Sequence, residues 1–307
     1  MSLLVVGSVA FDQIETPFGK SDKIVGGAGT YISITSSYFT KDLGIVSVVG
    51  DDFPQDYIDL FHQKNVNTDG LQIKEGEKSF FWAGKYHNDM NSRDTLVTEL
   101  NVLGTFKPVV PESFKNADIL MLGNLSPDVQ LSVIKQMANR PKLVVLDTMN
   151  FWMDIAKDDL DKVIAEIDVL TINDEEARQL SGEYSLVKAA KKIIAMGPKT
   201  LIIKKGEHGA LLFNDNEVFF APALPLEEVF DPTGAGDTFA GGFVGYLAKT
   251  GDISFTNMKR AIIYGSAMAS FCVEKFGSVR IENLTEKEIN TRVQQFVDLV
   301  QFDVTLD

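Results

Sequence analysis

The chain has 307 residues, of which 45% are hydrophobic, and this is enough to build a large packed core. A net charge of −14 and the lack of any run of five basic residues argue against a nucleic-acid-binding protein and against a polybasic membrane anchor. No apolar stretch of about 18 residues and no signal-peptide pattern are present, so we expect a cytoplasmic protein.

The chain begins with alternating strands and helices. Apolar strands are predicted over 3–9 and 44–49, and helices over 28–39 and 54–64. This β-α-β-α order indicates a parallel sheet whose strands are joined by crossover helices.

The alternation breaks after the second helix. Two strands, 79–86 and 95–100, are predicted on either side of a polar loop at 87–94, with no helix between them. We therefore expect an antiparallel excursion over about 74–104, joined by 11–25. It either covers a ligand with its aromatic residues or forms a plain hairpin at the sheet edge.

Strands and helices then alternate again, followed by a hairpin and a helical C-terminal part. The predicted strands are 118–122, 143–146, 169–172 and 200–204, the helices 174–180 and 185–196, the hairpin 209–213 with 217–221, and the last helices 235–249, 255–275 and 285–299. The sequence therefore predicts one α/β domain over 1–307.

The most informative stretch is 231–239, DPTGAGDTF, a glycine-rich turn that leads directly into an apolar helix. Successive N–H groups at a helix N-terminus form an anion site. A carboxylate there would repel bound phosphate, so Asp237 is predicted to accept a proton during phosphoryl transfer to an alcohol. The alternative is a plain turn in which Asp237 caps the helix.

This stretch resembles the second signature of the ribokinase-like (PfkB-type) carbohydrate kinase family almost letter for letter. The resemblance implies a doubly wound, mostly parallel sheet flanked by helices, with a small β-sheet lid. It also implies a kinase that uses ATP and Mg²⁺. Asp237 is then the base that deprotonates the acceptor hydroxyl, and the amides of Gly234, Ala235 and Gly236 form the anion hole.

Further family motifs follow in order along the chain. The end of the first strand resembles the family segment whose aspartate, here Asp12, holds sugar hydroxyls. Gly26 and Gly27 resemble the paired glycines that contact substrate. Asn173 and Glu176 match the Asn-x-x-Glu motif that organises magnesium and phosphate through bound water. Taken alone, Asp12 could cap a turn, and the acidic run at 173–176 could begin an ordinary helix.

The segment 203–209, IKKGEHG, resembles the Gly-x-x-Gly turn beside the nucleotide. The resemblance assigns Lys204, Gly206 and Gly209 to cofactor binding, together with Thr233. Asp231 and Thr233 also match positions around a monovalent cation in some family members, so activation by K⁺ is expected as well.

Two departures from the family bear on the acceptor. Tyr31 replaces an asparagine that reads the sugar, and its flat ring favours a ring-bearing or different polyol acceptor. The Asp-x-Asn-x-Arg pattern of many sugar kinases is altered to DTMNFW at 147–152. The missing arginine disfavours an acidic sugar, unless Arg93 of the polar loop supplies the charge; otherwise Arg93 is a solvated loop residue.

Three functions stay open. The acceptor is a sugar, or it is a nucleoside whose base stacks on aromatic side chains, or the protein is a silent ligand-binding sensor of the same fold. The intact Asp237 argues against the sensor. The aromatic residues that favour a nucleoside are Tyr31, Phe80, Phe81, Trp82 and Tyr86. A homodimer through the lid would cover an exposed strand edge.

Several other kinds of site are excluded, because the residues that they need are missing or wrongly spaced in the sequence. The Gly-Lys-Ser at 19–21 is no P-loop, because Ile14 stands where the first glycine is needed. The three histidines are scattered, and Cys272 is the only cysteine, so no zinc site is predicted. No Gly-x-Gly-x-x-Gly follows the first strand and no Gly-x-Ser-x-Gly elbow is present.

Overall fold

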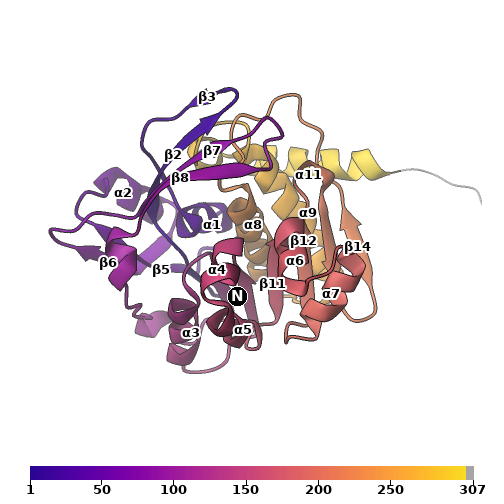
Figure 1. Ribbon diagram of the computed structural model, residues 1–307, viewed down its shortest axis with the longest axis horizontal. Coiled ribbons are helices and arrows are strands. Elements are labelled where there is room, and N and C mark those ends of the chain that lie inside the picture. The colour runs from indigo at the N-terminus through magenta and orange to yellow at the C-terminus, as the bar shows by residue number, and fades with distance from the viewer. Residues whose placement is uncertain (302–307) are drawn as a thin grey trace, which may run out of the picture.

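A nine-stranded sheet forms the centre of the computed structural model, which describes residues 1–301 (Figure 1). Its spatial order is β14-β13-β12-β11-β10-β9-β1-β5-β6. The strands from β6 to β12 pair in parallel, and the last two pair antiparallel. In chain order they are β1 (Leu3–Val6), β5 (Leu43–Gly50), β6 (Val66–Lys74), β9 (Ile119–Leu122), β10 (Leu143–Asp147), β11 (Val169–Asn173), β12 (Thr200–Lys204), β13 (Ala210–Phe213) and β14 (Val218–Ala221).

Hydrophobic side chains cover both faces of this sheet, as a parallel sheet requires. Because side chains alternate along a strand, Leu3 and Val5 face one hydrophobic cluster while Leu4 and Val6 face another. The first cluster is covered by α1 (Ala28–Ser36), α2 (Gln55–Gln63), α8 (Ala235–Thr250), α9 (Phe255–Cys272), α10 (Val279–Glu282) and α11 (Glu286–Val300). The second is covered by α3 (Pro127–Gln136), α4 (Asn150–Ile155), α5 (Lys157–Ile164), α6 (Asp174–Ser181) and α7 (Leu186–Ile194). The predicted doubly wound α/β architecture is therefore confirmed.

A second, smaller sheet lies above one end of the main sheet (Figure 1). Its order is β3-β2-β7-β8, and β4 also pairs with β2. Its strands are β2 (Ala10–Thr16), β3 (Gly19–Lys20), β4 (Ile24–Gly26), β7 (Phe81–Tyr86) and β8 (Arg93–Glu99). The chain enters it directly after β1, so the smaller sheet begins where the first central strand ends.

Three details differ from the sequence-based expectation. Strand β6 was not predicted, because its polar residues and Gly70 lack the apolar pattern of the central strands. The excursion is not purely antiparallel, since β7 pairs in parallel with β2 and antiparallel with β8. Arg93 is the first residue of β8 and does not lie in the loop.

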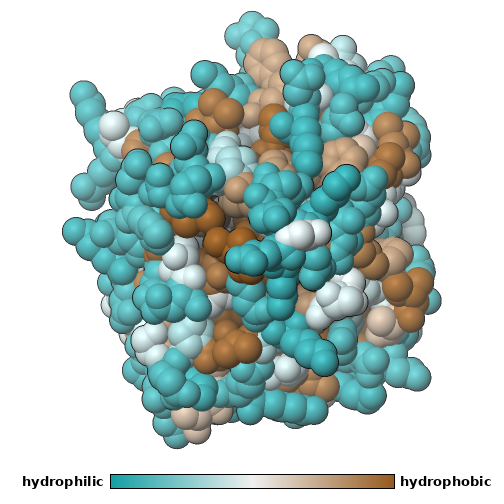
Figure 2. All heavy atoms as spheres, turned by 90° about the vertical axis from the view of Figure 1, so that its left-hand side faces the viewer, coloured by the Kyte–Doolittle hydropathy of each residue, from teal (hydrophilic) through white to brown (hydrophobic). Residues whose placement is uncertain are grey.

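The surface on the β6 side of the molecule is mostly hydrophilic, with small separated apolar patches (Figure 2). Within residues 1–301, no helix has both the length and the apolar composition needed to cross a membrane.

Candidate active site

Three polar residues lie at the carboxyl ends of neighbouring central strands, and two of them, Asn173 and Lys204, were predicted as site residues. Asp147, Asn173 and Lys204 are the last residues of β10, β11 and β12, which are neighbours in the sheet. The crevice outside the carboxyl ends of parallel strands is the usual ligand site of open α/β sheets. The smaller sheet lies over this end of the molecule (Figure 1).

The glycine-rich loop places Asp237 in the first turn of α8. Gly234 is the N-cap residue and has φ 75° and ψ 0°, a left-handed conformation that glycine adopts without steric cost. The Ala235 N–H donates to the Pro232 carbonyl at 3.1 Å. Within residues 1–301, the N–H groups of Gly234 and Gly236 have no hydrogen-bond acceptor, so they can receive an anion.

The ring of Tyr31 packs against the backbone of this loop at Gly234. A Cβ atom on Gly234 would lie 2.5 Å from the Cε1, Cε2 and Cζ atoms of the Tyr31 ring, so the loop backbone rests directly on the ring face. The Tyr31 side chain is buried in α1, and its hydroxyl has no hydrogen-bond partner within residues 1–301. Any change that lifts Gly234 from the ring therefore displaces the anion site.

A buried ion pair lies beside Asp237. The Lys204 Nζ donates to Asp147 Oδ1 at 3.2 Å and to Asp147 Oδ2 at 3.0 Å. A Cβ atom on Gly236 would lie 3.1 Å from the same Nζ, so the ammonium sits above the glycine loop. The pKa of Asp237 is raised to about 7; burial is the largest cause, the Asp147 carboxylate adds to it, and Lys204 opposes both. Asp147 was not predicted as a site residue, although a carboxylate ending a buried strand was a usable signal.

Asp12 lies in β2 against the paired glycines. A Cβ atom on Gly26 would lie 1.9 Å from Asp12 Oδ2, so only glycine fits there. Gly27 has φ 88°, and its backbone N–H has a lowering effect on the pKa of Asp12 that burial outweighs. Burial is the largest cause that raises the pKa of Asp12 to about 7. The structure thus brings together the four predicted substrate residues Asp12, Gly26, Gly27 and Tyr31, the last of which lies in α1.

The raised pKa of Asp12 makes a prediction for stability. The folded state binds the carboxyl proton of Asp12 more tightly than the unfolded chain does. Between about pH 4 and pH 7 the free energy of unfolding therefore falls as the pH rises. Asp12→Asn removes the buried charge while keeping a side chain of nearly the same shape. We expect its melting temperature at pH 8 to exceed that of the wild type by about 2–4 °C, and the gain to vanish near pH 4.

Thermal unfolding at pH 4, 6 and 8 measures this effect. The exposed Asp42→Asn serves as the control and should show the same small change at every pH. A gain for Asp12→Asn that does not depend on pH would contradict the buried-charge explanation.

Asn173 and Glu176 form a capping box at the start of α6. The Glu176 N–H donates to Asn173 Oδ1, and the Asn173 N–H donates to Glu176 Oε2, both at 2.8 Å. The Glu176 side chain is buried, and this burial raises its pKa to about 7, with Lys204 opposing the rise. Within residues 1–301, Glu176 Oε1 accepts no hydrogen bond. The box fixes one carboxylate oxygen and leaves the other available.

The two glycines of the 203–209 segment have different surroundings. Gly206 has φ 54°, and a Cβ atom there would lie 2.4 Å from Oδ1 of Asn91, in the turn between β7 and β8. The smaller sheet therefore touches this turn. A Cβ atom on Gly209 would lie 2.1 Å from the Ala221 carbonyl oxygen, so Gly209 is required for the close approach of β13 and β14.

Asp231 ties the glycine loop to a neighbouring turn. Its Oδ1 accepts the Thr233 N–H at 2.8 Å, and its Oδ2 accepts the Gly277 N–H at 2.9 Å. The Thr233 hydroxyl donates to the Tyr86 hydroxyl of β7 at 3.2 Å. Within residues 1–301, no three His, Cys, Asp or Glu side chains are grouped so as to hold a metal ion by themselves.

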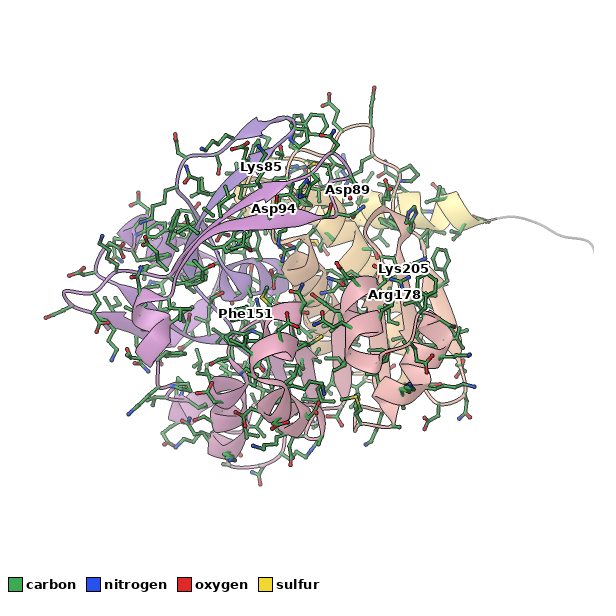
Figure 3. All side chains as sticks on the ribbon, viewed as in Figure 1. Lys85, Asp89, Asp94, Phe151, Arg178 and Lys205 are labelled. Atoms are coloured by element: carbon green, nitrogen blue, oxygen red, sulfur yellow. The ribbon has the colours of Figure 1, made fainter. Side chains whose placement is uncertain are left out.

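The smaller sheet contributes a positive charge to the site. The Arg93 guanidinium lies 5.8 Å from the Trp82 ring centroid and 6.0 Å from that of Tyr86, a cation–π arrangement. Its charge lowers the pKa values of Asp12 and Asp237, against the larger effect of burial. In the view of Figure 3, Phe151 of α4 lies below the smaller sheet. Asp89 and Asp94, which belong to the β7–β8 hairpin of that sheet, lie above Phe151.

Comparison with known proteins gives one family for nearly the whole chain. The sequence profile described as "pfkB family carbohydrate kinase" matches residues 2–284. A cytidine kinase of Thermococcus kodakarensis is 29% identical over 250 residues, which cover 80% of this chain and 87% of the relative.

Solved structures with the same fold include kinases of two acceptor classes. A nucleoside kinase of Burkholderia thailandensis, in complex with inosine, has a TM-score of 0.77 at 20% identity and covers 97% of this chain and 99% of its own. A ribokinase of Arabidopsis thaliana, complexed with ribose and ATP, has a TM-score of 0.73 at 21% identity and covers 95% of this chain and 98% of its own. At these identities the similarity shows the fold.

Proposed function

Because the chain belongs to the pfkB family of carbohydrate kinases, we propose that it transfers the γ-phosphoryl group of ATP to a hydroxyl group of a sugar or a nucleoside. The observation that carries this proposal is the position of Asp237. Its carboxylate lies in the first turn of α8, directly after a loop whose free amides suit a phosphoryl group. A base in that position can take a proton from a hydroxyl that attacks the same phosphoryl group.

The neighbouring residues have complementary roles in this proposal. Gly234 and Gly236 donate their N–H groups to the transferring phosphoryl group, and the Ala235 amide holds the loop in shape through Pro232. The Lys204 ammonium adds positive charge above Gly236, where negative charge develops. On the acceptor side, Asp12 and the paired glycines orient the hydroxyl-bearing group.

The Glu176 carboxylate at the start of α6 suits a magnesium ion that is bound together with the nucleotide. Mg²⁺ is usually held by one or two carboxylates together with substrate phosphates, and it keeps several waters. Glu176, with one oxygen fixed by Asn173 and the other available, suits a contact through water. When bound, the ion would neutralise charge on the phosphates.

A monovalent cation such as K⁺ suits the loop at 231–233. The Asp231 carboxylate is buried, and each of its oxygens accepts one backbone N–H, so further lone pairs are available. A cation bound there would compensate a buried negative charge next to the anion loop. We propose potassium activation on this basis, and comparing activity with and without K⁺ tests it.

The smaller sheet acts as a lid in this proposal. Tyr86 reaches Thr233 of the glycine loop, and Asn91 packs on Gly206 of the nucleotide turn. Both contacts join the smaller sheet to loops that would hold ATP, so closing it would exclude water from the transfer. Strand β8 is the edge of this sheet and all its residues are exposed, so a homodimer through this edge remains a prediction.

The nucleoside alternative is supported by the cytidine kinase relative and by aromatic residues facing the site. Trp82 and Tyr86 flank Arg93 on the smaller sheet, and Tyr31 replaces the usual sugar-reading asparagine. Flat rings of this kind can stack on a base. Phe81, by contrast, packs against the hydrophobic core, so it is less available for stacking.

Release of ADP with Mg²⁺, with and without K⁺, over pentoses, hexoses and nucleosides tests the proposal. We expect one acceptor class to give activity at least about 100-fold above the Asp237→Asn background, which would assign the acceptor. ATP binding without product across the panel would instead support a silent sensor of the same fold.

A further inference from the structure

The Asp147–Lys204 ion pair joins two central strands at the site. Asp147 ends β10 and Lys204 ends β12, and both Asp147 oxygens accept hydrogen bonds from the one ammonium. The side chains retain only 7% and 17% of their exposure. The ends of the two strands on either side of β11 thus hold the ammonium in one place.

Three carboxylates attract this ammonium. Burial by itself lowers the pKa of Lys204, but the carboxylates outweigh it and raise the pKa above its usual value, Asp147 most, followed by Glu176 of α6 and Asp237 of α8. The other charged groups that act on Asp237 are Asp12 of β2 and Arg93 of β8. In this structure Asp147 alone of the three carboxylates forms hydrogen bonds with Lys204 within residues 1–301.

We propose that Asp147 is a positioning residue that holds the Lys204 ammonium above Gly236 and keeps it from pairing with Asp237. This inference rests on the proposed kinase function. It extends that function to a residue that touches neither the acceptor nor the phosphoryl group in the scheme above.

The need for such a residue follows from the chemistry of the base. An ammonium paired with Asp237 would stabilise the ionised carboxylate, lower its pKa and weaken it as a proton acceptor. It would also occupy the oxygens that must reach the hydroxyl. Held by Asp147, the same ammonium stays close enough to Gly236 to stabilise charge on the transferring phosphoryl group.

Asp147→Asn tests the proposal, because it keeps the shape and removes the charge that fixes Lys204. We expect kcat to fall about 10–100-fold while the KM for ATP stays within about threefold. The acid limb of the pH profile should move to lower pH, since Asp237 loses the repulsion of Asp147 and gains Lys204 as a partner. Asp147→Glu restores the carboxylate and should recover part of kcat.

A double-mutant cycle separates positioning from a general loss of packing. In a Lys204→Met background, Asp147→Asn should change kcat less than about threefold, because no ammonium is left to position. Asp168→Asn is a matched control: Asp168 is a buried aspartate that pairs with Arg140 at 3.1 Å, just before β11 and so at the opposite end of the strands. It should lower stability without changing kcat.

Titration of the Asp237 carboxyl carbon by NMR gives a readout independent of turnover. The pKa of Asp237 should be lower in Asp147→Asn than in the wild type. The proposal would be overturned if the effects of the two substitutions on kcat were additive. It would also be overturned if Asp147→Asn changed neither the acid limb of the pH profile nor the pKa of Asp237. If the wild type phosphorylates no acceptor, the proposed function fails by itself. The Asp237 titration then tests positioning through the same cycle: the fall in pKa caused by Asp147→Asn should be larger with Lys204 present than in the Lys204→Met background, and an equal fall would overturn the proposal.

Discussion

Asp237→Asn should lower kcat by about 10²–10⁴-fold and leave nucleotide binding intact. The amide has nearly the same shape as the carboxylate but cannot accept the proton of the attacking hydroxyl. Its neutral charge also removes a repulsion with the phosphates, so the dissociation constant for ATP should be unchanged or lower. Single-turnover kinetics and nucleotide binding, measured on the same preparation, check the two parts of this result.

The same substitution bears on the pH dependence. Burial and the Asp147 carboxylate raise the pKa of Asp237 to about 7. The base acts only when deprotonated, so kcat/KM for the wild type should fall about tenfold per pH unit below pH 7 and level off above it. In Asp237→Asn the residual activity should lose this acid limb. Near-normal turnover that keeps this acid limb would show that another group is the base.

The sequence predicted the local turn at 231–239 better than it predicted which side chains surround that turn. Asp237 and its glycines are contiguous and lie at the start of a helix, so the local pattern alone predicted a turn suited to an anion there. Asp147 and Lys204 are separated by 57 positions and meet only because β10 and β12 flank β11. Nothing in either segment by itself specifies that pairing.

The missed strand β6 has a related physical cause. Central strands reveal themselves by continuous apolar runs, because both faces are buried. Strand β6 is the last strand of the main sheet, and most of its residues are partly exposed, so its sequence is polar and includes Gly70. Its assignment comes from pairing with β5, which is a tertiary contact. Arg93 was misplaced for a similar reason, because β8 is an exposed edge strand.

Gly234→Ala should have the second large effect, on both activity and stability. At φ 75° an alanine incurs about 1–2 kcal/mol from the left-handed conformation. Its Cβ would lie 2.5 Å from the Tyr31 ring, which is 1% exposed and so has no room to retreat; such overpacking adds about 1–3 kcal/mol. The loop must lift instead, and the Gly234 and Gly236 amides then leave the position of the phosphoryl group. We expect kcat to fall at least about 100-fold, as when an oxyanion donor is lost.

Gly251→Ala separates the two causes, because Gly251 caps the other end of α8. It has φ 68°, almost the same backbone conformation, but a Cβ atom there would meet nothing within 4 Å. It should therefore lose only about 1–2 kcal/mol of stability and keep kcat within about twofold. Thermal unfolding and steady-state kinetics of the two variants give the comparison. Equal losses of stability in Gly234→Ala and Gly251→Ala would mean that the Tyr31 ring moves away to make room for the new methyl group. Unchanged kcat in Gly234→Ala would mean that the phosphoryl group does not depend on the loop resting on that ring.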